Sequence, residues 1–159
     1  MMIQRLEQLL RIVVAVIFLF FVSISFIQVV LRYGFAHSLP WIDELSRYSF
    51  IWLIFLASAV VARQGAHIAI DIIEDLASPA LRRRMLILAD LSLIVFAAVV
   101  GIAGWRLVEI NWTTLSPASG IPIAWVQLIL PTFGLLMTVF AAAHLRDVWN
   151  QRPDGPGER

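Results

Sequence analysis

Four apolar stretches, separated by shorter polar segments, dominate the pattern of hydrophobic and polar positions along this chain. Each stretch is about 20 residues long, which is the length that an α-helix needs to cross a hydrocarbon core about 30 Å thick. The pattern therefore predicts an all-α membrane protein with four transmembrane helices. The predicted spans cover residues 12–31, 41–62, 85–108 and 125–145.

The segment between the second and third spans carries helical signals of its own. Over residues 68–77, apolar residues at helical spacing lie opposite acidic residues, which predicts a short amphipathic helix on the membrane surface. Ser78 and Pro79 are typical of an N-cap followed by a first-turn proline, so the third helix should begin at Pro79 and continue to about Trp112. A helix of that length must tilt in the bilayer or protrude from it.

The two ends of the chain differ in character. The first span ends at Leu31-Arg32-Tyr33 without a small-residue cleavage site, so it is expected to be a retained anchor rather than a signal peptide. Residues 150–159 are polar and rich in Pro and Gly, which predicts a disordered tail. Residues 1–149 are then expected to form one membrane domain.

Composition supports a membrane protein, and the distribution of charge predicts its orientation. The chain is 60% hydrophobic and 14% charged, and its mean hydropathy is +0.86, outside the range of soluble domains. All 12 basic residues are Arg, of which nine flank the termini and the middle segment and three lie on the other side. The positive-inside rule therefore places both termini, the surface helix and the tail in the cytoplasm. The tryptophans expected to form a belt at the outer interface are Trp41, Trp105, Trp112 and Trp125.

Several kinds of chemistry lack a candidate in the sequence. The absence of Cys excludes disulfides, thiolate metal sites and Cys-attached haem. We find no nucleophilic triad, no pair of carboxylates in a pocket and no phosphate-binding loop in the sequence. We therefore expect no enzymatic activity, no bound cofactor and no nucleic-acid partner. His37, His67 and His144 all lie outside the spans or at their edges. That placement disfavours the alternative function, a haem- or quinone-binding membrane anchor of a respiratory dehydrogenase.

The densest polar cluster lies at the outer end of the second span. Trp41, Asp43, Glu44 and Arg47 fall within its first two turns, and Arg47 is four and three residues from the two carboxylates. Helical spacing predicts that Arg47 pairs locally with one of them. The cluster is interpreted as a solvated helix end, which the helix dipole favours, or as a surface that docks a partner protein. A third interpretation is a site that binds substrate or an ion directly.

Among the residues of the predicted spans, Asp90 has the highest free-energy cost of placement in the membrane. It lies in the inner leaflet, where a carboxylate must face a protein interior or a basic partner. The expected partner is an Arg, such as Arg63 or one on another subunit. A proton or ion relay is the alternative, although Ser92 is the only further polar group beside it on that helix.

Small residues and a proline indicate how the spans pack. Pro131 predicts a kink in the fourth span. Small residues recur at intervals of four, which permits close contact between helices. So few polar groups leave little room for a transport pathway, which disfavours a self-assembling channel and favours a subunit that packs against a larger partner. The small residues are Ser58 and Ala62, Ala97 and Gly101, and Gly134, Thr138 and Ala142, and the run from Gly101 to Gly104 is interpreted as a packing surface.

Four motifs, in order along nearly the whole chain, carry a resemblance to a known family. They are LPWIDELSR at 39–47, WLIFLA at 52–57, RQGAHIAID at 63–71 and SPASGIPIAW at 116–125. With the four-helix plan, they resemble the small membrane subunit of TRAP transporters, the DctQ-like family of tripartite ATP-independent periplasmic transporters. The position after the Phe-Leu pair, usually Gly in that family, is Ala57 here.

The resemblance implies a multi-pass protein of the bacterial inner membrane. Its partners would be the lipid bilayer, a large permease subunit that carries the substrate and sodium sites, and a periplasmic substrate-binding protein. The small subunit would be a non-catalytic scaffold for sodium-coupled uptake of a carboxylate such as a C4-dicarboxylate, a keto acid or a sialic acid.

The resemblance also suggests where partners would bind. The cluster from Trp41 to Arg47 would lie at the periplasmic face, where it could dock the binding protein or brace the large subunit. Arg63, Gly65 and His67 would lie at the cytoplasmic turn, where Gly65 could permit a positive-φ bend. His67 would either stabilise that turn by a hydrogen bond or contact a partner.

Overall fold

The computed structural model describes residues 2–65 and 79–150, and this part of the chain is almost wholly helical. Four of its helical segments are long and apolar enough to cross a membrane, namely Arg5–Gly34, Pro40–Ala62, Arg83–Ile110 and Ala124–Arg146. The predicted all-α fold with four spans is confirmed. The helices are α1 (Met2–Gly34), α2 (Pro40–Gly65), α4 (Pro79–Ile110), α5 (Ala124–Gln127) and α6 (Ile129–Asn150).

Proline begins two of the long helices. α2 starts at Pro40 and α4 at Pro79, where the missing N–H costs nothing and the fixed φ suits the first helical turn. The predicted start of the third helix is thus confirmed, and its 32 residues extend over about 48 Å. The predicted surface helix at 68–77, the Ser78 cap and residues 151–159 of the predicted tail lie outside the described residues.

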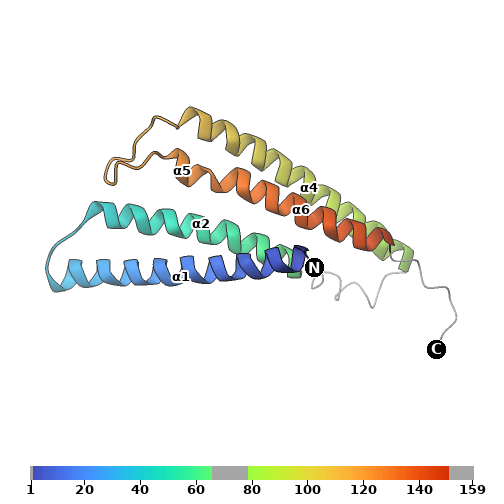
Figure 1. The fold of residues 1–159 in the computed structure, drawn as a ribbon, viewed down its shortest axis with the longest axis horizontal. Coiled ribbons are helices and arrows are strands. Elements are labelled where there is room, and N and C mark those ends of the chain that lie inside the picture. Colours follow the sequence, from blue (N-terminus) through green and yellow to red (C-terminus); the bar gives the residue numbers. More distant parts are fainter. Residues whose placement is uncertain (1, 66–78, 151–159) are drawn as a thin grey trace.

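The long helices lie side by side in one layer rather than in a closed bundle. α1 packs along α2, α2 along α6, and α6 along α4, so the order across the layer is α1, α2, α6, α4 (Figure 1). The loop between α1 and α2 and the loop between α4 and α5 lie at the same end, and the N-terminus lies at the other (Figure 1). This arrangement fits four successive crossings of a membrane.

A compact apolar cluster holds the layer together where α1, α2, α4 and α6 approach one another. Phe55 on α2 meets Phe133 on α6 edge to face, with ring centroids 5.2 Å apart, a geometry that aromatic pairs favour. The buried members of the cluster are Leu10, Leu56, Ala59, Val60, Ala97, Ile129, Phe133, Met137 and Phe140.

The contact between α4 and α6 is close because glycines face each other across it. A Cβ on Gly134 would lie 2.6 Å from the Ala97 carbonyl oxygen and 2.8 Å from the Gly101 Cα. The packing role predicted for the Ala97 and Gly101 pair and for Gly134 is therefore confirmed. Small residues let two helix backbones approach in a bilayer, where dispersion contacts drive association.

The fourth span is interrupted where its proline removes a hydrogen bond. α5 ends at Gln127 and α6 begins at Ile129, because Pro131 has no N–H to donate to the Gln127 carbonyl oxygen. The helical hydrogen-bond pattern resumes at Thr132, whose N–H and hydroxyl both donate to the Leu128 carbonyl oxygen, at 3.2 Å and 2.7 Å. The break between the two helices lies at Leu128, and the kink predicted at Pro131 stays a prediction.

Candidate functional site

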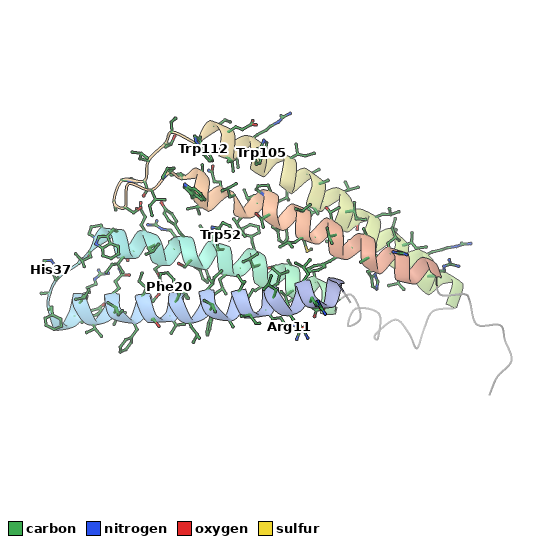
Figure 2. The ribbon with its side chains drawn as sticks, in the orientation of Figure 1. Arg11, Phe20, His37, Trp52, Trp105 and Trp112 are labelled. Carbon is green, nitrogen blue, oxygen red and sulfur yellow. The ribbon has the colours of Figure 1, made fainter. Side chains whose placement is uncertain are left out.

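The polar cluster predicted at the start of α2 divides between surface and interior. Trp41 is 45% exposed and Glu44 is 7% exposed, and the side chains of Asp43 and Arg47 are exposed. Trp105 and Trp112 lie at the same end, beside the α4–α5 loop, whereas Arg11 on α1 lies near the opposite end (Figure 2). The predicted tryptophan belt is thus gathered at one end of the layer, where the rings of Trp112 and Trp125 are 6.4 Å apart.

Asp43 joins α2 to α1. Its carboxylate accepts a hydrogen bond from the side-chain amide of Gln28. One turn further along, the hydroxyls of Ser25 and Ser46 are 2.8 Å apart. These two polar contacts fix the register of the first helical hairpin at the end that carries its loop.

Glu44 joins α2 to the loop between α4 and α5. Its Oε2 accepts a hydrogen bond from the backbone N–H of Ser119 at 2.8 Å, across 75 residues of sequence. The loop itself is a short hairpin in which the Ser116 N–H donates to the Ile121 carbonyl oxygen at 2.9 Å. Gly120 completes the turn with φ of +69°, a conformation that glycine adopts without strain.

Arg47 does not form the local pair that helical spacing predicted. Within the described residues, neither Asp43 nor Glu44 makes an ion pair with it. Both carboxylates instead accept hydrogen bonds from partners outside α2, on Gln28 and Ser119. The Ser119 donor is a backbone N–H that the loop hairpin already holds in place, whereas an exposed ion pair must immobilise two long side chains for little gain.

Asp90 has a partner within the chain that the sequence did not identify. Its Oδ2 is 2.8 Å from Nδ1 of His144 on α6, and the Asp90 residue is only 5% exposed. A buried carboxylate needs such a partner, because leaving it unpaired in an apolar region is costly. In the sequence, the pairing of Asp90 with His144 was indicated only by their positions, which lie towards the same end of the two neighbouring helices.

The predicted residues at the other end of α2 are only partly described. Arg63 lies in the last turn of α2, and Gly65 ends the helix. His67 lies outside the described residues. The roles predicted for these three residues stay predictions.

An apolar cavity of about 400 Å³ lies between α1, α2 and α5. Its lining includes Phe20 on α1, Trp52 on α2 and Trp125 on α5, and the first two are labelled in Figure 2. A helix with its side chains is about 10–12 Å across, so the cavity admits side chains or hydrocarbon tails rather than a whole helix.

Only three polar or charged residues are buried among the described residues. The buried polar or charged residues are Glu44 and Ser116 near the loops, and Asp90 towards the opposite end. The cluster between them is apolar. Within the described residues there is also no group of three potential metal ligands. The buried part of the described residues thus consists mainly of apolar helix contacts.

Three relatives show similarity over most of the chain. A putative TRAP transporter small permease protein of Haemophilus influenzae is 25% identical over 76% of this chain and 74% of its own. The C4-dicarboxylate TRAP transporter small permease protein DctQ of Pseudomonas aeruginosa is 28% identical over 74% of this chain and 59% of its own. The isethionate TRAP transporter permease protein DctMQ of Oleidesulfovibrio alaskensis is 32% identical over 70% of this chain but only 18% of its own.

A family model gives the same result over a longer range. The model for the DctQ component of tripartite ATP-independent periplasmic transporters matches residues 21–151, which include parts or all of α1, α2, α4, α5 and α6. The match agrees with the four apolar helices and with the motif order in the sequence. The chain therefore belongs to the DctQ family of small permease subunits of TRAP transporters.

Proposed function

We propose that this chain is the non-catalytic scaffold of a TRAP permease. It binds the large permease subunit and holds it in the bacterial inner membrane for sodium-coupled uptake of a carboxylate delivered by a periplasmic binding protein. The observation that carries the proposal is the apolar layer itself, because its described helices offer contact surface but no polar route through the membrane.

The layer leaves much apolar surface available for a partner. Of the residues of the first span, Arg5–Gly34, only Leu10 and Ile24 are buried within the chain. Large exposed side chains follow α1 along its length, including Phe18, Phe26 and Val29. The DctMQ relative supports a large partner, since the segment similar to this chain forms only 18% of that permease.

The substrate is proposed from the relatives rather than from a binding site. One relative is named for C4-dicarboxylates and another for isethionate, so the family serves more than one organic anion. A scaffold of this kind needs no contact with the substrate, and we assign the choice of carboxylate to the other subunits.

The orientation follows from charge and from the arrangement of the helices. The nine Arg residues of the termini and middle segment favour the cytoplasmic side. The α1–α2 and α4–α5 loops then face the periplasm, together with the exposed side chains of Trp41, Asp43 and Arg47. On this side the cluster braces the large subunit or docks the binding protein.

The alternative function, a respiratory membrane anchor, gains no support. His37 lies in the α1–α2 loop (Figure 2), whereas His144 lies near the other end of the layer and is hydrogen-bonded to Asp90. These two residues are therefore too far apart along the layer to hold one haem between them.

Co-expression tests the scaffold proposal. The tagged chain is expressed with a large TRAP permease subunit from the same genome, and the two should purify together in mild detergent. Deleting the small subunit should abolish uptake while a plasmid copy restores it, with the amount of large subunit measured in parallel. Purification of the chain alone, together with unchanged uptake after its deletion, would refute the proposal.

A further inference from the structure

The apolar cavity between α1, α2 and α5 opens onto the lipid-facing surface of the layer. Val16 and Phe20 on α1 line the cavity, yet they are 59% and 46% exposed. Trp125 on α5 also lines it and is 56% exposed. These side chains belong both to the cavity and to the outer surface of helices that can cross a membrane. The cavity is therefore continuous with the surface by which the protein meets the bilayer.

The cavity extends along the helices over the depth of one leaflet. On α2 its lining runs from Leu45 to Trp52, which are about 10 Å apart along the helix axis at 1.5 Å per residue. Ile121, in the α4–α5 loop, lines its outer end (Figure 1), and Phe20 lies at the middle of the first span, Arg5–Gly34. Half of a hydrocarbon core is about 15 Å thick. The cavity thus matches the depth of the lipid tails in the leaflet on the side of the two loops.

The lining favours an apolar occupant. Ser49 contributes a hydroxyl to the lining, but this hydroxyl donates to the Leu45 carbonyl oxygen within α2 at 2.8 Å. Water does not fill such a cavity, because each water molecule needs two or more polar partners. At about 30 Å³ for a group the size of a water molecule, 400 Å³ holds about 13 such groups, which is comparable to the bulk of one long hydrocarbon tail.

Packing energy favours a filled cavity over an empty one. Side chains that face a void lose the dispersion contacts that a neighbouring atom would give, and the broad aromatic faces of Trp52 and Trp125 lose most. Lipid tails are as apolar as these side chains and surround the helices at this depth. Trp125 lies at the start of the fourth span, where an indole ring also favours the level of the headgroups.

We propose that this cavity is a binding site for one tail of a phospholipid from the leaflet on the side of the loops. The tail lies against Phe20, Trp52 and Trp125, which come from three different helices. The lipid thereby fills the space between the α1–α2 hairpin and α5. The site is formed by this protein chain alone and does not depend on the partners proposed above.

Two serines of α2 provide matched variants. The hydroxyls of Ser49 and Ser58 each donate to the carbonyl oxygen four residues earlier, at 2.8 Å. Ser49 lines the cavity, whereas Ser58 is exposed elsewhere on the helix. Ser49→Phe places a ring in the cavity, and Ser58→Phe makes the same chemical change outside it. Ser49→Ala removes the hydroxyl without filling the space.

A phospholipid with a photoactivatable diazirine in the middle of one tail measures occupancy of the cavity. The full chain is reconstituted in vesicles of phosphatidylethanolamine and phosphatidylglycerol with a trace of this lipid, and mass spectrometry locates the cross-links after irradiation. In the wild type we expect the cross-links to concentrate on the residues that line the cavity. Ser49→Phe should lower their share there by about tenfold, because the ring takes the space that the tail needs. Ser58→Phe and Ser49→Ala should leave it unchanged.

Three outcomes would overturn the proposal. Cross-links spread evenly over the exposed apolar side chains of α1 would show ordinary contact with the bilayer, and this wild-type result is decisive even if Ser49→Phe does not accumulate. Equal effects of Ser49→Phe and Ser58→Phe would show that the cavity is not the site. Loss of the cavity cross-links in the assembled permease would show that a segment of another subunit fills the cavity instead of a lipid.

Discussion

The contact between α4 and α6 makes the sharpest prediction, because two facing glycines should respond differently to the same substitution. In Gly134→Ala, the new Cβ would lie 2.6 Å from the Ala97 carbonyl oxygen and 2.9 Å from the Gly101 nitrogen. These are backbone atoms, which cannot rotate aside. In Gly101→Ala, the nearest atom would be the Gly134 Cα at 3.6 Å, an ordinary contact.

The magnitude follows from the distance that the helices must move. Restoring an ordinary 3.4 Å contact to the Ala97 oxygen requires a separation of about 0.8 Å. A gap of about 0.5–1 Å removes a quarter to a half of the dispersion energy of each contact along the interface. Overpacking usually costs about 1–3 kcal/mol, and the better helix propensity of Ala returns about 1 kcal/mol. We expect a net loss of up to about 2 kcal/mol for Gly134→Ala, and no loss for Gly101→Ala.

Reversible unfolding in mixed detergent micelles, followed by circular dichroism, measures both variants on one scale. The control shares the interface, the chemical change and the gain in helix propensity, so the difference between the two isolates the clash. If Gly134→Ala unfolds at the same or a higher denaturant fraction than Gly101→Ala, the close approach described here does not determine the stability of this helix pair.

Two further predictions concern the hydrogen-bonded residues Asp90 and His144 and the orientation. Asp90→Ala should lower the free energy of unfolding by about 1–3 kcal/mol, because the His144 nitrogen loses the buried carboxylate as its partner. Asp90→Asn should lower it by less. Equal losses in the same unfolding assay would contradict a hydrogen-bonding role. Because the chain has no Cys, single-Cys variants can report its topology. A membrane-impermeant thiol reagent should label Thr113→Cys in intact cells, and should label Gln8→Cys only after permeabilisation. The reverse labelling pattern would contradict the proposed orientation.

The features that the sequence predicted correctly depend on local properties. A span is defined by the length of an apolar run, so its bounds could be estimated before any packing was known. The start of α4 at Pro79 follows from the covalent structure of proline. The proximity of Gly101 and Gly134 could be anticipated only as a tendency of small residues, whereas their direct opposition required the structure.

The partners of the charged residues could not be predicted in this way. Asp90 and His144 are separated by 54 residues, and Glu44 and Ser119 by 75. Spacing along one helix suggested Arg47 as the partner of the carboxylates, because i,i+3 and i,i+4 neighbours are the only contacts that a single helix reveals. Donors on α1 and on the α4–α5 loop displaced that local option.

The order α1, α2, α6, α4 has a mechanical consequence. The main contacts of the described helices are joined in series, so that each hairpin is held internally and the α2–α6 seam links one hairpin to the other. In a closed bundle, the loss of one contact is shared by the remaining pairs. In this layer, weakening the α2–α6 contact would leave the two hairpins linked only at the loop end, where Glu44 accepts a hydrogen bond from Ser119. The α2–α6 contact therefore largely determines how firmly the two hairpins are held together.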